Sequence, residues 1–511
     1  MKSIRTRMVS SRARLFGHAS ARTFALRVLP MLLLLSAAVA ARPGGGESYH
    51  GGSSSSGGGG SSSGGGDGAA AGLIIDLIIL CIQYPPLGIV VVIALIVYSR
   101  IKRTQGAGLK EWTAGVPQNQ VKPQRPHFVA RAALDRLRST DPQFSVVLFE
   151  DFLFTLYAQF HSNRPGRNLE KLSPYVAAEV RQAVHDDQLQ SVNGIVIGAL
   201  RYVGLTQSPF HVRLEVEVEA NFTETRNGKP ERLYVLERMI LARPVTARSR
   251  PPQRARLLDC PNCGAPLEAI RGNVCSYCRE RVDDGRFDWM LQAIHCVKYE
   301  KRPPLLTEDV VERGSELPTR VTTGVHQRLA ELGQQDPAFQ YEAFLGRVKV
   351  IFSELQIGWS NQDLMRIRPH VSDNLLQYFG YWFDVYLQAG ARNVTENARI
   401  LHIDLANLIS DNVYDAITVR VFATGLDYTL GNDGRLLKGS RNAERPYTEY
   451  WTLIRGRATR GPVRTALQCP NCGAPLKINM AGTCEYCQAK VVTGDFDWVL
   501  SRIEQDEAYD G

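Results

Sequence analysis

The sequence lacks the motifs that mark most enzyme active sites. It contains no Gly-rich phosphate loop, no recognisable set of nucleophile, base and orienting acid, and no metal site with an open position. Outside two paired clusters it has only two cysteines, Cys81 and Cys296. We therefore expect a protein that is not an enzyme, and no small-molecule substrate is identified.

A general excess of basic charge is also missing. Residues 1–40 contain seven lysines and arginines and no acid, and removing these seven from the net charge of +9 leaves +2 for the rest of the chain. A nearly neutral body has no basic footprint for nucleic acid, so nucleic acid is not the expected partner.

Cysteine occurs mainly in one pattern, which appears twice: C-x2-C, eleven residues, C-x2-C. Four thiolates at this spacing can close a tetrahedron around one zinc ion and leave no open position, which is typical of a structural site. We predict two structural zinc ions, bound by Cys260, Cys263, Cys275 and Cys278 and by Cys469, Cys472, Cys484 and Cys487. Disulfides are the main alternative, and an iron–sulfur cluster fits less well because the ferredoxin spacings are missing.

The N-terminal part predicts a membrane anchor. Residues 1–40 resemble a secretory signal peptide, with a mitochondrial presequence as the alternative, and residues 41–72 form a Gly/Ser-rich disordered tether. Residues 73–98 are mostly apolar and long enough for one transmembrane helix, although Pro85-Pro86 must kink or break it. Basic residues follow in the linker 99–127, so we expect everything after the span to lie on the cytoplasmic side.

The remaining chain reads as a repeat. Asp141-Pro142 matches Asp336-Pro337 at an offset of 195, and the Cys clusters match at an offset of 209. We predict a first domain at 128–247, a first zinc ribbon at 257–298, a linker at 299–320, a second domain at 321–458 and a second ribbon at 466–505.

Each repeat predicts helices followed by antiparallel strands, which is an α+β unit. In the first repeat, apolar residues from Phe144 to Phe160 recur with helical spacing and a second helix is expected over Leu169–Asp187. Strands are expected at Gly194–Val203, His211–Asn221 and Leu233–Leu241, with a hairpin turn at Asn227-Gly228, and in the second repeat at Arg399–Leu408, Asp415–Tyr428 and Tyr447–Arg457.

Two features flank each Cys cluster. The cluster is followed by Phe287-Asp288-Trp289 or Phe496-Asp497-Trp498, which we expect to begin a short helix that packs the ribbon onto the sheet. Arginines precede it and are expected to offset the negative charge of the thiolate site, with phosphate or headgroup binding as the alternative: Arg243, Arg248, Arg250, Arg254 and Arg256, and Arg455, Arg457, Arg460 and Arg464.

Residues 336–457 contain a set of motifs that includes Trp359-Ser360, Arg368-Pro369, Arg392-Asn393-Val394, residues 414–420 and residues 447–451. With these motifs the second repeat resembles the Tim44-like domain, the family named for the membrane anchor of the mitochondrial import motor, and the first repeat is more divergent. The resemblance implies tandem cone-shaped domains with the fold of nuclear transport factor two, and an apolar pocket that docks lipid or protein. Within the motifs the candidate binding residues are Trp359, Arg392 and Trp451.

The leading hypothesis is a membrane-tethered scaffold that docks membrane proteins, chaperones or lipid headgroups, with a role in protein translocation. The resemblance favours a bacterial-type member in the inner membrane, spanning once with its C-terminal region cytoplasmic; the mitochondrial inner membrane is the alternative. One alternative function is a zinc-ribbon protein that contacts the ribosome or nucleic acid at the membrane. A second is a hydrolase or isomerase in a cone pocket, with His402, Asp404, Asp415 and His211 as candidates.

Overall fold

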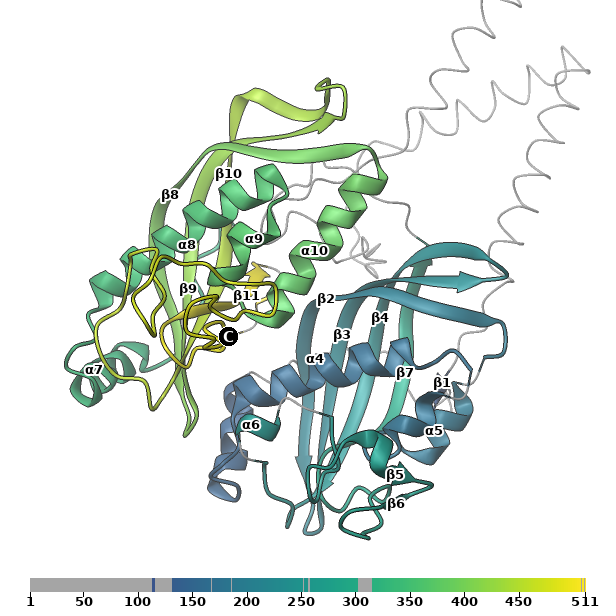
Figure 1. Ribbon diagram of the computed structural model, residues 1–511. Helices are drawn as coiled ribbons and strands as arrows, with labels where there is room; N and C mark the ends of the chain where they lie inside the picture. The colour runs from purple at the N-terminus through teal and green to yellow at the C-terminus, as the bar shows by residue number, and fades with distance from the viewer. Residues whose placement is uncertain are drawn as a thin grey trace, which may run out of the picture. The chain divides into compact units, whose positions relative to one another are not determined.

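The computed structural model describes residues 113–114, 131–301 and 315–511, apart from residues 167, 185, 251, 256, 257, 507 and 510. The predicted signal peptide, tether and transmembrane helix lie outside the described residues, as do most of the linker 99–127 and part of the linker 299–320. Among the helices that are described, none has the length and apolar character needed to cross a bilayer. The chain divides into two compact units, which correspond to the two repeats and are treated one at a time (Figure 1).

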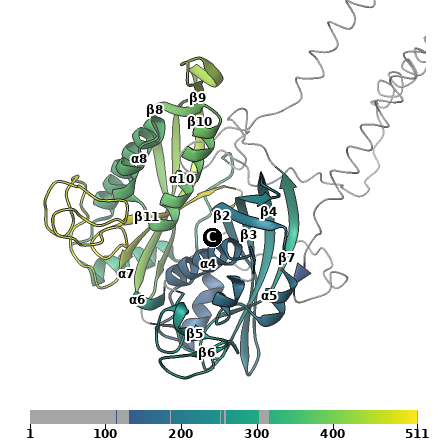
Figure 2. The same cartoon turned by 45° about the vertical axis from the view of Figure 1, so that its right-hand side comes forward.

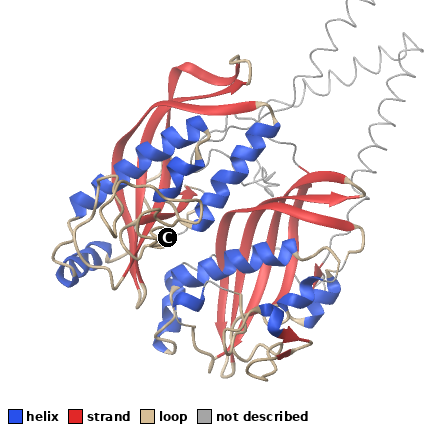
Figure 3. Ribbon diagram, in the orientation of Figure 1, coloured by secondary structure: helices blue, strands red, loops and turns tan. Residues whose placement is uncertain are grey.

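The first repeat is a curved antiparallel sheet with helices on one face (Figures 1 and 3). Helix α4 (Val146–Ser162) lies across strands β2 (Leu189–Gln207), β3 (His211–Arg226), β4 (Lys229–Pro244) and β7 (Met290–Lys301), and the sheet order is β1-β7-β4-β3-β2. Strand β1 (Thr113–Ala114) pairs with the outer edge of β7. The shorter elements are η2 (Arg131–Ser139), η3 (Asn168–Leu172), α5 (Ala178–Ala183), α6 (Pro252–Ala255), η4 (Leu267–Ala269), β5 (Ile270–Arg271) and β6 (Val274–Cys275).

Local sequence explains these elements. Alternate residues of β3, among them Val212, Leu214 and Val216, are buried in the core because successive side chains of a strand point to opposite faces. Asn227 and Gly228 both have positive φ, which is the type I′ geometry of a tight hairpin, and they join Arg226 directly to Lys229 across the sheet. The hairpin prediction is therefore confirmed.

The second repeat has the same arrangement. Helices α8 (Tyr341–Asn361) and α10 (Asp373–Gln388) lie against a sheet whose order is β11-β10-β9-β8, as Figure 2 shows. The strands are β8 (Ala391–Ser410), β9 (Tyr414–Gly431), β10 (Leu436–Gly456) and β11 (Val499–Gln505). Three shorter helices complete the repeat: α7 (Val325–Gln335), α9 (Leu364–Ile367) and η5 (Arg368–His370). The α+β class and the expected strands are thus confirmed in both repeats, and the strands are longer than predicted.

The second helix of the first repeat is not continuous. The second helix expected at Leu169–Asp187 is broken into η3 and α5, because Pro174 lies between them and cannot continue a helix. In the second repeat the corresponding helix α10 has 16 residues where α5 has 6, which accounts for much of the extra length of that repeat.

The segments that follow the Cys clusters are strands and not helices. Residues 290–301 form β7, which pairs with β4, and residues 499–505 form β11, which pairs with β10. Equivalent parallel bridges, Val176 to Leu291 and Val371 to Leu500, join each of these strands to the segment before its second helix. Each ribbon is therefore inserted between the last two strands of its own sheet, and residues that we had assigned to the ribbons complete the sheets.

Candidate metal centres and the cores that hold them

Each predicted set of four cysteines is brought together in space. Within each cluster, Cys260 with Cys263, Cys275 and Cys278, and Cys469 with Cys472, Cys484 and Cys487, all four sulfur atoms lie within 4.8 Å of one another. The sulfur–sulfur distance is 3.9 Å between Cys260 and Cys278, 3.7 Å between Cys263 and Cys275, and 3.8 Å between Cys469 and Cys487. Each cluster can hold one metal ion.

These distances fit a tetrahedral metal site and exclude disulfides. A zinc–sulfur bond of about 2.3 Å places the sulfurs of a tetrahedron about 3.8 Å apart, whereas a disulfide joins two sulfurs at about 2.05 Å. All eight cysteines are free thiols in the structure. The disulfide alternative is therefore wrong, while the identity of the metal is not given by the geometry.

In both clusters, backbone N–H groups point at cysteine sulfurs. The Ala489 backbone N–H and the Asn471 side chain donate hydrogen bonds to Cys487 and lower the pKa of its thiol to about 6. In the first cluster the backbone N–H groups of Asn262 and Cys263 donate to Cys260, although burial still raises its pKa to about 12. Turns whose amides point at sulfur are what a bound cation requires, because it needs the thiols deprotonated.

Each ribbon is joined to its sheet by the Asp-Trp pair that follows the cluster. Asp288 accepts a hydrogen bond from the Trp289 backbone N–H at 2.8 Å, and Asp497 accepts one from Trp498 at the same distance. Asp288 also pairs with Arg250 at 2.8 Å, and Arg250 reaches Asp259, the residue before the first Cys, at 2.7 Å. The arginine thus connects the two ends of the inserted ribbon.

A buried ion pair sits behind each tryptophan. Arg243 contacts Asp141 at 2.9 Å and lies 4.9 Å from the Trp289 ring centroid. In the second repeat Arg455 contacts Asp336 at 2.9 Å and lies 4.9 Å from the centroid of Trp498. We call these two arrangements the Asp–Arg–Trp clamps. Arg243 and Arg455 therefore hold the last strand in the core, and neither the charge-offset nor the headgroup interpretation applies to them.

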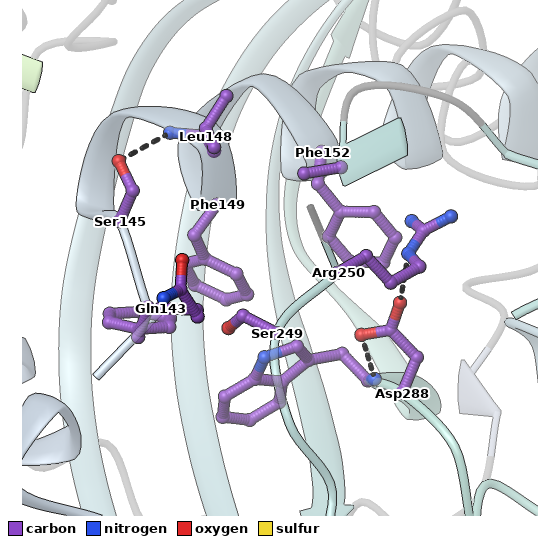
Figure 4. Close-up of a pocket in the computed structure, with 11 residues that line it drawn as sticks. Gln143, Ser145, Leu148, Phe149, Phe152, Ser249, Arg250 and Asp288 are labelled. Carbon is purple, nitrogen blue, oxygen red and sulfur yellow. Dashed lines mark hydrogen bonds and ion pairs between the residues drawn. The ribbon is translucent and has the colours of Figure 1, made fainter. Parts of the chain in front are cut away.

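A small pocket opens beside the first clamp (Figure 4). It lies between the start of α4, where Ser145 accepts the helix-capping hydrogen bond of Leu148, and the Ser249-Arg250 segment. Arg250 is one of the lining residues, and its guanidinium is already balanced by Asp288 and Asp259. The pocket therefore does not offer an unbalanced cation to a ligand.

Two of the three candidate binding residues are core residues. Trp359 and Trp451 are at most 1% exposed, and their indole N–H groups donate to Asn393 at 2.7 Å and to Glu449 at 2.9 Å. Trp359 packs against Phe379, Phe383 and Tyr386 inside the second repeat. Arg392 lies exposed at the start of β8. Both tryptophans belong to the family motifs and pack in the core, and in this structure they present no surface to a ligand.

The candidate acid–base residues do not form an enclosed site. His402 and Asp404 are hydrogen-bonded at 2.5 Å on β8, but the His402 side chain is 65% exposed. His211 is exposed at the start of β3, and Asp415 is buried in β9, so the four candidates are not gathered in one cavity.

The first repeat contains a buried polar network that sequence reasoning missed. His161 contacts Glu237 at 2.9 Å, Tyr157 donates to the same carboxylate at 2.5 Å, and Arg164 joins His161 to Glu224. All five side chains are buried. Tyr157 and His161 lie one turn apart on α4 and Arg164 follows the end of that helix, but the carboxylates come from strands far away in the sequence. Because none of these side chains reaches the solvent, the network has a structural role in the core of the first repeat.

This network makes a testable prediction about pH. Burial alone would raise the pKa of Glu237, but His161 and the hydrogen bonds from His161 and Tyr157 outweigh it, so its pKa lies below the usual value. A depressed carboxyl pKa contributes stability above the unfolded pKa of about 4.3, and this stability is lost as pH falls through the folded pKa. We expect Glu237→Gln to lower the unfolding midpoint in urea at pH 7 and to flatten its fall between about pH 5 and 3. A variant with an unchanged acid slope would contradict the assignment.

The fold and the site define a class of protein: tandem α+β domains, each with a curved sheet, helices on one face, and a four-Cys cluster that can hold a metal ion, inserted before its last strand. Residues 325–463 match the family model of the Tim44-like domain, so the second repeat contains that domain. A comparison with curated proteins returned no match. The Tim44-like domain is consistent with a membrane-associated role in protein translocation.

Proposed function

We propose that this chain is a membrane-tethered scaffold whose two α+β domains dock membrane proteins, chaperones or lipid headgroups during protein translocation. The observation that carries the proposal is the match to the Tim44-like domain in one of two repeats of the same topology. The apolar run 73–98 ahead of the repeats supports attachment to the membrane. Basic residues after the run support a cytoplasmic position for both repeats, in a bacterial inner membrane or, as the alternative, a mitochondrial one.

We propose zinc as the ion of both centres, in a structural role. The support is the all-thiolate donor set, the sulfur spacing and the backbone N–H groups directed at the sulfurs. The eight cysteines would hold the two ions, and each ion would supply a cross-link that its small ribbon otherwise lacks. With four protein ligands each, neither ion has a position for substrate.

We propose that the chain is not an enzyme. The exposure of His402 on β8 and the burial of the His161–Glu237 network both support this. The His402–Asp404 pair is open to solvent, and the His161–Glu237 network is closed to substrate. A catalytic pair needs a cavity that a substrate can enter and that shields it from bulk water.

Site-directed crosslinking in intact membranes tests the scaffold. A photo-activated residue at Leu387 or Leu401, two apolar side chains that are more than half exposed on the second repeat, is expected to form a defined adduct with a membrane protein or chaperone. The matched control lacks residues 73–98, and it should leave the membrane fraction and lose the adduct. If the full chain yields neither a protein adduct nor a lipid adduct, or yields RNA with a steep salt dependence, the scaffold is wrong.

A further inference from the structure

The outer face of the second sheet holds a short segment of the chain's own C-terminal region. In β9, Ile417, Val419 and Val421 point into the core, so Arg420 between them lies on the opposite face. In β10, Trp451 packs on Phe352 of α8, which places Tyr450 and Thr448 on that outer face as well. After β11 the chain turns back, and Tyr509 donates a backbone hydrogen bond to Gln505 at 2.9 Å. Asp506 and Tyr509 then lie on the outer face.

Two contacts hold this segment. Asp506 pairs with Arg420 at 2.7 Å and also accepts a hydrogen bond from Thr448. Three residues later, Tyr509 stacks on Tyr450 with ring centroids 3.8 Å apart and an angle of 12° between the planes. Both the Arg420 and the Tyr509 side chains are about 1% exposed. The segment thus binds through one acid and one aromatic ring at a fixed spacing.

The segment before α7 completes the same surface. The Arg320 side chain donates to the backbone carbonyl of Tyr509, and its backbone N–H donates to the Tyr450 hydroxyl at 2.9 Å. Arg420 donates to the carbonyl of Leu317 at 2.6 Å. The face therefore offers two arginines and a tyrosine ring, which fit an acidic segment with an aromatic residue.

At the equivalent position of the first repeat, the charged residue finds its partner within the sheet. Glu217 lies six residues into β3, as Arg420 lies six residues into β9, and Glu217 pairs with Arg238 directly across the sheet at 2.5 Å. Its charge is balanced by the neighbouring strand. Arg420 has Thr448 as its neighbour on β10 and takes a carboxylate from residues 506–509, outside the sheet.

We propose that the outer face of β9 and β10 is a docking site for an acidic D-x-x-Y segment of a partner protein, and that Asp506–Tyr509 occupies it in cis. A tethered segment competes with an effective concentration of about millimolar, so it keeps the site closed until a partner with more contacts displaces it. Local opening of a four-residue segment beyond the last strand is much easier than unfolding the sheet. The proposal rests on the described residues and holds whether or not the chain spans a membrane.

A synthetic peptide with the sequence of residues 504–509 tests the site in trans. We expect the full-length double variant Asp506→Ala/Tyr509→Ala to bind this peptide at least tenfold more tightly than the wild type, measured by fluorescence anisotropy. Tyr509→Ala alone keeps the ion pair and should give an intermediate affinity. Adding Arg420→Gln to the double variant should abolish binding, whereas adding Glu217→Gln, the matched change in the first repeat, should not.

Thermal unfolding of the same variants makes the result decisive. If the double variant keeps a cooperative transition and gains the peptide, the segment is a displaceable occupant. If it binds the peptide no better than the wild type, or loses its cooperative transition, residues 506–509 are a fixed part of the fold and the docking site does not exist.

Discussion

Replacing Cys484 by serine is expected to remove one of the two proposed metal ions and to unfold the second ribbon, while both sheets stay folded. The buried part of this ribbon holds only two thiols and three aliphatic side chains, Cys469, Cys484, Ile478, Val491 and Val492. A core of that size cannot offset the conformational entropy of the segment, so the metal must supply the difference. The apparent binding free energy of a structural zinc site is about 10–16 kcal/mol, which makes this the largest single effect in the chain.

The sheet should survive because its last strand has its own anchor. Trp498 is fully buried against Phe344 and Arg455, and β11 pairs with β10 independently of the cysteines. Metal analysis and hydrogen exchange check both parts: exchange should rise in residues 467–495 and stay low in residues 499–505. Cys275→Ser should produce the same loss in the first ribbon alone, and Cys296→Ser, at a cysteine of β7 outside both clusters, should change neither metal nor exchange. Loss of protection throughout β11 would show that the strand depends on the metal.

The second large effect is expected at the Asp–Arg–Trp clamp. Asp336→Ala leaves the guanidinium of Arg455 buried without its carboxylate, and removing one partner of a buried pair costs about 3–5 kcal/mol. The same change removes hydrogen bonds that Asp336 accepts from the Gly461 backbone N–H. The free energy of unfolding of the second repeat, measured with denaturant, should fall by that amount.

Two controls make the clamp prediction specific. Asp433→Ala breaks an exposed pair with Arg435 and should leave the stability nearly unchanged, because exposed ion pairs contribute little. Asp141→Ala should destabilise the first repeat as Asp336→Ala destabilises the second, since Asp141 contacts Arg243 in the same way. A small effect of Asp336→Ala, similar to that of Asp433→Ala, would mean that the clamp does not hold the domain together.

Local patterns predicted much of this structure. The alternation in β3, the helical spacing of α4 and the Asn227-Gly228 turn are all short-range features that physical chemistry restricts to one outcome. The Cys clusters were equally clear, because two C-x2-C pairs at this spacing are typical of a metal site with four thiolate ligands.

The segments after the clusters could not be predicted in the same way. A short apolar run such as Trp289-Met290-Leu291 has too few residues to distinguish a helix from a strand, and it becomes a strand because β4 offers it an open edge. The clamps were hidden for a related reason. Asp141 and Arg243 are 102 positions apart in the numbering, and only the folded sheet brings them to 2.9 Å. Trp359 and Trp451 were candidates for binding but lie in the core. Similarity to a family marks core positions and binding positions alike, so it does not separate the two roles.

We propose that each repeat closes its inserted ribbon with one metal ion held by four thiolates. X-ray absorption and elemental analysis of the purified full-length chain measure the metal and its ligands. We expect two zinc ions per chain, each surrounded by four sulfurs at about 2.3 Å. A protein that folds with all eight cysteines metal-free, or that shows zinc with oxygen or nitrogen ligands in place of sulfur, would contradict it.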